Sequence, residues 1–347
     1  MGANMQEIEI DFFGPHDAPG VAQLFRQVYG EGYPIDIYYH PERLIEENAA
    51  GRVLSSVARS QDGEVIGHDA LVLLDPATRL YENAAGVILP GFRGQGVFFR
   101  LIQHNVFEYA KRLGLQEILG EPVCNHLQLQ KMCLQLGYRE TGLEVDLMPA
   151  AAYTKEQSAQ GRVSVLLGYF LHNPVPRTVF LPPVYRDELE YLYAGTRVER
   201  AFGGTNGALP AAEESQGKMD TFAFAQVSRI SIHRIGSDFE AFILRLENEA
   251  GEKGTEIFQV WLPLTSPFGP AATDILRKHG YFIGGLLPGW VGGDGLLMQK
   301  VTCETDWASI ALYSEHAKRI GEIVRSDQKK NKFNPLYRKK EGTCVHN

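Results

Sequence analysis

The stretch "RGQGVF", Arg93 to Phe98, combines residue types that can bind a phosphate. Glycines at the start of a helix leave main-chain N–H groups accessible, and the positive end of the helix dipole attracts an anion. Arg93 adds a full charge on a planar fork that matches phosphate oxygens. The same glycines would also serve a plain strand-to-helix turn that needs only their backbone angles. Both interpretations are open on local composition.

Two better-known phosphate loops do not fit this turn. The dinucleotide motif GxGxxG fails because Phe99 stands where the third glycine belongs. The P-loop motif fails because no Lys-Ser or Lys-Thr follows the glycines. A nicotinamide-type loop and a P-loop are therefore excluded.

The elements around the turn must place a strand before it and a helix after it. "YENAAGVILP" predicts a strand closed by Pro90. A helical stripe then runs until Gly114, through Val97, Phe98, Leu101, Ile102, Val106 and Ala110. From Ile8 to Leu113 the pattern predicts strand, helix, helix, strand, strand, strand and helix, with a hairpin at Asp62-Gly63 and Asp17 as a helix cap.

The rest of the first half continues with a strand in "LQEILGEPV", a helix in "NHLQLQKMCLQLG" and a strand in "YRETGLEVDLMP". Antiparallel hairpins mixed with helices predict an α+β or mixed α/β fold that closes near Pro149. Residues 151–218 are expected to be a connection with one helix and one exposed loop.

In the second half, strands are expected in "FAFAQVSRISIHRI", "FEAFILRLENE" and "TEIFQVWLPL", and a helix in "AATDILRKHG". A terminal helix in residues 301–327 would use Ile310, Leu312, Ala317, Ile320 and Ile323 as part of an apolar face. Residues 134–143 and 277–286 share Gly, Tyr, Gly and Leu at a constant offset of 143 residues, which indicates a weak repeat of one helix-to-strand unit.

Composition limits the class of protein. The 347 residues fit two domains, and 44% hydrophobic with 22% charged residues is typical of a globular chain. No apolar run is long enough to span a bilayer, and the N-terminus does not resemble a secretory signal, so a cytoplasmic protein is expected. Four cysteines without a CxxC pair predict neither disulfides nor a metal site.

A net charge of −8 argues against a general nucleic-acid surface. The basic stretch "KKNKFNPLYRKK" could touch an anionic partner or form a solvated tail.

The segment "VILPGFRGQGVFFRLI" resembles the coenzyme A loop of the GNAT superfamily of N-acetyltransferases, and "PVCNHLQLQKMCLQLGYRETG" resembles the second motif of that family. The resemblance covers almost all of residues 7–149 and implies the GNAT-like acyl-CoA N-acyltransferase fold. It implies acetyl-CoA or another acyl-CoA as co-substrate, and no metal. The implied binding groups are the N–H groups of Gly94, Gln95, Gly96, Val97 and Phe98 for the pyrophosphate, Arg93 to shape the loop, Val87 and Ile88 along the pantetheine arm, and Asn125 near that arm. Asn125 could also be a plain helix N-cap.

The sequence departs from the family pattern at two positions. Phe98 stands where Gly or Ala is usual, and Cys133 stands where a Tyr is the frequent general acid. Cys133 could protonate a leaving thiolate or be a small core residue. Glu82 and Glu121 are candidates for the base, with solvated strand-end carboxylates as the alternative. An amine acceptor would suit the aromatic and acidic residues of the first helices, Tyr29, Tyr33, Tyr38, Tyr39, Glu31, Asp36 and Glu42.

The segment "LPLTSPFGPAATDILRKHGYFIGGLLP" resembles the closing part of a second GNAT domain without the coenzyme A loop, since the glycines of "ENEAGEKGTE" precede a strand. We therefore expect tandem domains: a GNAT domain over 1–150, a connection over 151–218 and a degenerate GNAT-like domain over 219–347.

The leading hypothesis is an acyl-CoA-dependent N-acyltransferase that moves an acetyl group to a primary amine in a ternary complex, without a covalent enzyme intermediate. A non-catalytic acyl-CoA-binding or regulatory module is the alternative, and a scaffold that has lost the ligand is a third. The expected partner is a small-molecule or peptide amine, with neither nucleic acid nor membrane, and a homodimer is one option for assembly.

Overall fold

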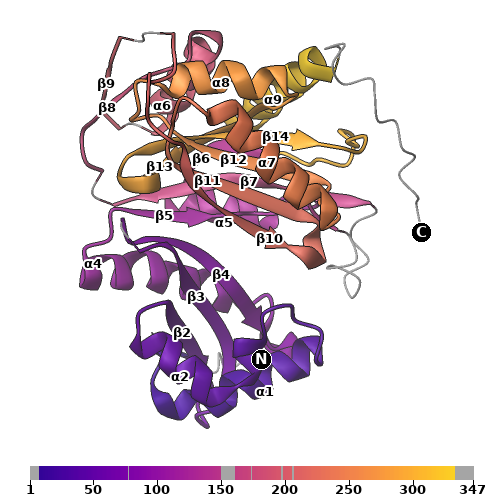
Figure 1. Cartoon of the computed structure of the whole chain (residues 1–347). Helices are drawn as coiled ribbons and strands as arrows, with labels where there is room; N and C mark the ends of the chain where they lie inside the picture. Colours follow the sequence, from indigo (N-terminus) through magenta and orange to yellow (C-terminus); the bar gives the residue numbers. More distant parts are fainter. Residues whose placement is uncertain are drawn as a thin grey trace. The chain divides into compact units, whose positions relative to one another are not determined.

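The computed structural model describes residues 8–76, 78–149, 161–172, 174–196, 198–204 and 207–332. Its internal contacts divide the chain into two compact units (Figure 1). Unit 1 comprises residues 1–121 and 170–173, and unit 2 comprises residues 122–169 and 174–347. Among the described residues, no helix is long and apolar enough to cross a membrane.

Unit 1 contains strands in the order β1-β2-β3-β4-β5. Their bounds are β1 (Glu9–Phe12), β2 (Val53–Arg59), β3 (Val65–Asp75), β4 (Leu80–Ile88) and β5 (Glu117–Gly120). Neighbours from β1 to β4 are antiparallel, whereas β4 and β5 are parallel because a helix connects them. The mixed α/β class predicted from the sequence is confirmed.

The helices of unit 1 cover both faces of these strands, and they follow the predicted order. They are α1 (Ala18–Tyr29), α2 (Pro41–Ala49) and α3 (Val97–His104), which continues through a π-helical turn (Asn105–Tyr109) into α4 (Ala110–Leu113). Alternate strand residues face opposite sides. Val65 therefore packs with α1 and α2, whereas Ile66 packs with Val97 and Leu101 of α3.

The predicted hairpin between β2 and β3 is confirmed. Gly63 takes a φ of +81°, which suits glycine, and the Ser60 N–H donates to the Glu64 carbonyl at 2.9 Å. Asp17 is the N-cap residue of α1, as predicted, but its side chain makes no capping hydrogen bond there. Its carboxylate instead accepts the Gly14 N–H at 2.8 Å and pairs with Arg59 at 2.8 Å.

Unit 2 contains strands in the order β7-β6-β13-β14-β12-β11-β10. Their bounds are β6 (Arg139–Pro149), β7 (Arg162–Leu171), β10 (Gln216–Phe222), β11 (Val227–Arg234), β12 (Ile257–Pro263), β13 (Phe282–Pro288) and β14 (Asp294–Val301). A separate parallel pair is formed by β8 (Arg177–Val179) and β9 (Arg200–Phe202). The helices are α5 (Gln128–Leu136), α6 (Arg186–Thr196), α7 (Phe239–Glu252), α8 (Gly269–Lys278) and α9 (Glu315–Lys332).

Residues 151–218 contain the strand β7, which pairs antiparallel with β6, besides the expected helix, and their role as a connection stays a prediction. Two expectations about the second half are wrong. "FEAFILRLENE" is not a strand but lies in α7, where Phe239, Ile243 and Leu246 are buried at helical spacing. The terminal helix starts only at Glu315, so Ile310 and Leu312 lie before it.

The boundary between the compact units falls after Glu121, whereas the expected domain boundary lies near residue 150. The units therefore do not coincide with the expected tandem domains, and a division at 150 and 219 stays a prediction. Within unit 2, both copies of the weak repeat are a helix followed by a strand, α5 to β6 and α8 to β13.

The two copies of the repeat meet at one pair of glycines. Gly142 of β6 pairs with Gly285 of β13, and these residues are separated by the repeat offset. A Cβ on Gly142 would lie 2.8 Å from the Gly285 Cα, and a Cβ on Gly285 would lie 2.3 Å from the Gly142 Cα. Both strands therefore need glycine where they pair.

Candidate functional site

The turn after β4 is built by two glycines with left-handed backbone angles. A short 3₁₀ turn (Pro90–Phe92) follows the strand, and Gly94 and Gly96 then take φ values of +78° and +76°. No atom lies within 4 Å of a Cβ built on either glycine. The turn therefore requires glycine for its backbone angle and not for space. It delivers the chain into α3 at Val97.

Six successive main-chain N–H groups of this turn remain available. Among the described residues, none offers an acceptor to the N–H groups of residues 94–99. The N–H of Arg93 is engaged by Pro90, and the N–H of Arg100 donates to the Gly96 carbonyl at 3.1 Å. Gly94, Gln95 and Gly96 are also exposed to solvent. Such a run at a helix start can bind an anion.

The side chains of Arg93 and Gln95 donate hydrogen bonds to main-chain carbonyls within the turn and the strand before it. Arg93 Nε donates to the Ile88 carbonyl at 3.3 Å, and Gln95 Nε2 donates to the Gly91 carbonyl at 3.2 Å. Both bonds link residues before the helix, so they fix the path of the turn without using its free N–H groups.

Among the described residues of unit 1, one side of β4 has no strand partner just before the turn. β4 and β5 pair only from Tyr81 to Asn83 of β4. Within unit 1, the following residues of β4 pair with β3 alone. The β3 pairing also skips at Asp69, opposite a bulge in which Ala85 has a φ of +57°. On its β5 side, the main chain near Val87 and Ile88 therefore has no strand partner in unit 1, and the Ile88 carbonyl already accepts from Arg93 Nε.

Phe98 packs on β4. A Cβ placed on Gly86 would lie 2.3 Å from the Phe98 ring and 2.8 Å from Asp69 Oδ1. Because Gly86 has no side chain, the Phe98 ring and Asp69 Oδ1 occupy the space where a Cβ would stand. The large residue at this position of the turn is accommodated by a glycine on the neighbouring strand.

The predicted catalytic residues fall in both units. Glu82 is half-buried on β4, and Glu121 is half-buried directly after β5. Cys133 is buried in α5 of unit 2, as the packing alternative requires. Asn125 also lies in unit 2, and it is not the cap of α5, whose N-cap residue is Leu127. Unit 1 by itself brings together the turn, β4, Glu82 and Glu121.

The tyrosines expected on the acceptor side form one aromatic cluster in unit 1. Tyr38 stacks on Phe25 with ring centroids 4.6 Å apart, Tyr33 meets Phe25 at 4.9 Å, and the Tyr39 hydroxyl accepts the Tyr33 N–H at 2.8 Å. Burial raises the pKa of Tyr33 and Tyr38, and the nearby charges of Glu82 and Asp69 raise both further. This cluster is therefore next to carboxylates of the sheet.

The acidic residues expected beside these tyrosines have other partners. Glu31 pairs with Arg26 at 3.2 Å and Asp36 pairs with Arg43 at 2.7 Å, both in exposed positions. Glu42 is exposed at the start of α2. The carboxylates that act on the aromatic cluster are instead Glu82 and Asp69.

Asp69 is a functional candidate that the sequence reasoning missed. Its side chain is 1% exposed, Oδ2 accepts from Asn105 Nδ2 at 2.7 Å, and Oδ1 has no hydrogen-bond partner among the described residues. Burial raises the pKa of Asp69 to about 8, although hydrogen bonds from Asn83 and Asn105 lower it in part. The adjacent His68 is also buried, and burial lowers its pKa to about 4. Two polar residues inside the apolar strand "VIGHDALVLL" were the available signal.

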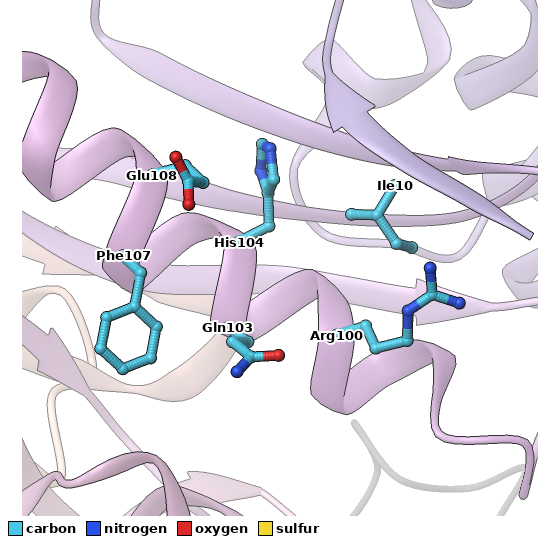
Figure 2. A pocket seen from close by; sticks show the side chains of 6 residues that line it. All are labelled: Ile10, Arg100, Gln103, His104, Phe107 and Glu108. Atoms are coloured by element: carbon cyan, nitrogen blue, oxygen red, sulfur yellow. The ribbon is translucent and has the colours of Figure 1, made fainter.

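A chain of hydrogen bonds links Asp69 to a surface groove. Asn105 Oδ1 accepts from the Ser56 hydroxyl at 2.5 Å, and the Ser56 oxygen lies 2.7 Å from His104 Nδ1. His104 lines a groove of about 430 Å³ (Figure 2). The other lining residues are Ile10 of β1 and Arg100, Gln103, Phe107 and Glu108 of the helix. This groove does not include the residues of the glycine turn.

Unit 2 has a comparable junction, in which a strand, a helix and a parallel strand follow one another as β11, α7 and β12. There the N–H groups of Gly236 and Ser237, just before the helix, are already used. Ser237 N–H donates to the Glu213 carbonyl at 2.8 Å, and Gly236 N–H donates to Ser215 Oγ at 3.0 Å. In unit 2 the segment between strand and helix that corresponds to the glycine turn is therefore residues 235–238. The segment "ENEAGEKGTE", which was expected there, covers instead the end of α7 and the residues before β12.

No group of three or more His, Cys, Asp or Glu side chains in the described ranges could hold a metal ion. No family model matches the sequence, and no curated protein matches it.

Solved structures resemble about half of the chain. They include the ribosomal-protein-S5-alanine acetyltransferase of Vibrio fischeri, with 12% identity, coverage of 49% of this chain and 95% of that one, and a TM-score of 0.40. The spermidine/spermine N-acetyltransferase of Vibrio cholerae has 18% identity, covers 48% and 94%, and has a TM-score of 0.38. A proposed acetyltransferase of Salmonella typhimurium, solved with its cofactor acetyl-CoA, has 12% identity, covers 48% and 94%, and has a TM-score of 0.40. The first two structures are of acetyltransferases, and the third is of a proposed acetyltransferase.

Proposed function

We propose that unit 1 binds an acyl-CoA and transfers its acyl group, most simply acetyl, to a primary amine. The observation that carries this proposal is the run of unengaged N–H groups over residues 94–99, where β4 passes into α3. A main-chain anion site next to an unpaired strand edge suits a ligand that joins a pyrophosphate to an extended amide-containing arm.

The pyrophosphate would be held by the N–H groups of Gly94, Gln95, Gly96, Val97 and Phe98. The positive end of α3 adds to the attraction, and Arg93 keeps the turn in shape through its bond to Ile88. The pantetheine arm would lie along β4, where Val87 and Ile88 have main-chain groups that β5 does not use.

The transfer itself would be a direct attack by the amine nitrogen on the thioester carbon. A main-chain N–H of β4 that polarises the thioester carbonyl, together with the fixed positions of both substrates, would supply most of the rate. Glu82 or Glu121 would accept the proton of the attacking amine. A small-molecule or peptide amine would be bound near the tyrosine cluster, whose aromatic faces and neighbouring carboxylates favour a cation.

The test is titration of acetyl-CoA into the full chain by calorimetry, with two matched variants. Gly96→Val places a β-branched residue at a φ of +76° inside the turn. Gly114→Val makes the same change at a φ of +62° at the other end of the helical segment, where a Cβ also meets no atom within 4 Å. We expect Gly96→Val to abolish binding and Gly114→Val to retain it. If both variants bound acetyl-CoA with the affinity of the wild type, the turn would not be part of the binding site.

A thiol-release assay over a panel of amines then separates an enzyme from a binding module. Release of coenzyme A that depends on one class of amine supports the transferase. Tight binding of acetyl-CoA with no release for any amine would support the acyl-CoA-binding alternative.

A further inference from the structure

We infer that Asp69 is the acid that protonates the departing sulfur in this acyl transfer. The inference rests on the proposed function and assigns a role to a residue that the sequence motif does not include. It follows from three features of unit 1: the place of Asp69 against β4, the direction of the hydrogen bonds around it, and its ionisation.

Asp69 lies at the bulge where the unpaired part of β4 begins. The β3 pairing passes from His68 opposite Val87 to Ala70 opposite Ala84, which leaves Asp69 facing Ala85 and Gly86. Its Oδ1 is so close to Gly86 that a Cβ there would lie 2.8 Å from it. An arm that starts at the turn and passes Val87 and Ile88 brings its sulfur-bearing end to this part of β4. Asp69 Oδ1 is therefore near the expected position of the thioester.

The hydrogen bonds around Asp69 distinguish its two oxygens. Ser56 donates to Asn105 Oδ1, so the amide of Asn105 is oriented with its Nδ2 towards Asp69 Oδ2. Oδ2 is thus engaged as an acceptor. Oδ1 has no other partner among the described residues, so it is the oxygen from which the neutral carboxyl can deliver a proton.

The carboxyl is neutral at neutral pH because its burial raises the pKa to about 8. Hydrogen bonds from Asn83, Asn105 and the Ala70 N–H lower this pKa in part. Tyr33 and Tyr38 of the neighbouring cluster are uncharged because burial raises their own pKa values. At the end of the chain of hydrogen bonds, burial also lowers the pKa of His104. The pKa of about 8 is close to the pKa of a free thiol, for which about 8.5 is typical. An acid with such a pKa suits proton transfer to a thiolate.

The step balances without a further reagent. The amine nitrogen forms a bond to the thioester carbon, and the carbon–sulfur bond breaks. The sulfur takes the proton from Asp69 Oδ1 and leaves as the thiol. Glu82 or Glu121 accepts the proton that the ammonium loses, and this proton then returns to the Asp69 carboxylate, directly or through water. The products are the amide and coenzyme A, and the enzyme returns to its starting state.

The experiment compares Asp69→Asn with Asp75→Asn in the full chain. Asparagine keeps the size of the side chain and still accepts from Asn105, but it has no acidic proton. Asp75 is at the far end of the same strand and serves as the matched control. We expect Asp69→Asn to bind acetyl-CoA with wild-type affinity and to lose about 100-fold or more in turnover, as general-acid removal does. Asp75→Asn should turn over at the wild-type rate.

Two readouts separate an acid from a merely structural residue. Wild-type turnover should fall as the pH rises above about 8, when Asp69 loses its proton, and Asp69→Asn should show no such fall. Infrared difference spectra of the wild type at pH 7 should contain the carbonyl band of a protonated carboxylic acid, and this band should be missing in Asp69→Asn.

Turnover of Asp69→Asn within about twofold of the wild type, with the alkaline fall retained, would overturn the inference. Absence of the carboxylic acid band in the wild type would overturn it as well, even if the variant does not fold. Failure of the wild type to bind acetyl-CoA would refute the proposed function instead, so the two failures are distinguishable.

Discussion

The buried carboxyl of Asp69 should make the stability of unit 1 fall as the pH rises. Asp69 is 1% exposed and its pKa is raised from 3.8 to about 8. In the unfolded chain the carboxyl releases its proton near pH 4, whereas the folded chain retains it until about pH 8. Between these values the unfolded state binds fewer protons, so a rising pH favours unfolding. Asp69→Asn removes this titration.

The size of the effect follows from the two pKa values. Each pH unit between them costs the folded state about 1.4 kcal/mol, because that is the free energy of one pKa unit. Between pH 5 and pH 8 the wild type should therefore lose about 4 kcal/mol relative to Asp69→Asn. At pH 5 most of the difference should be absent.

Urea unfolding followed by far-ultraviolet circular dichroism at both pH values measures this difference. All 3 tryptophans, Trp261, Trp290 and Trp307, lie in unit 2, so their fluorescence reports separately on that unit. A stability difference between the wild type and Asp69→Asn that is the same at pH 5 and pH 8 would refute the reasoning, because Asp69 would then titrate at an ordinary pKa in the folded chain.

Three further predictions concern neighbouring or buried groups. Burial lowers the pKa of His68 to about 4, so its contribution to stability is present above pH 6.5 and is lost as the pH falls through 4. The wild type should therefore lose about 3 kcal/mol more in its free energy of unfolding than His68→Gln does over this acid range, as measured by urea unfolding at each pH. Gly142→Ala should destabilise unit 2 by about 2 kcal/mol or more, measured as a lower urea midpoint, since the new Cβ would meet the Gly285 main chain at 2.8 Å; an unchanged midpoint would mean that the two strands can separate. Asp294→Asn should lower the free energy of unfolding by about 3 to 5 kcal/mol in the same assay. The reason is that the side chain of Arg200 is 1% exposed and would lose the carboxylate whose Oδ2 lies 2.5 Å from its Nε. A loss below about 1 kcal/mol would argue against a buried charge pair.

The sequence predicted the strand, the turn and the helix around Gly94 and Gly96 because their signals are local. A proline, two glycines and a helical stripe occur within about thirty residues. The same holds for the hairpin at Gly63. Elements whose identity depends on pairing or packing with distant parts of the chain were not predicted. The strand β7 became recognisable only through its pairing with β6, and α7 was mistaken for a strand because its short apolar run fits both periods.

The candidate site divides in the same way. The available N–H groups of the turn could be anticipated from residue types, since glycine and a helix start are sufficient cues. The importance of Asp69 could not, because it depends on Asn105, which follows 36 residues later, and on a bulge in β4. Phe98 is a related case. Its size at that position is explained by Gly86 on a strand twelve residues earlier, and no local pattern connects the two.

Two of the strand-to-helix junctions, β4 to α3 and β11 to α7, give any binding experiment an internal reference. The junction at Gly94 to Phe99 has open amides, whereas the amides of Gly236 and Ser237 at the other junction are engaged by the hydroxyl of Ser215 and the carbonyl of Glu213. A diphosphate added to crystals should give density at the first and none at the second, and both results would come from one data set. Anion density at both would mean that simple charge attraction, without open amides, accounts for the signal.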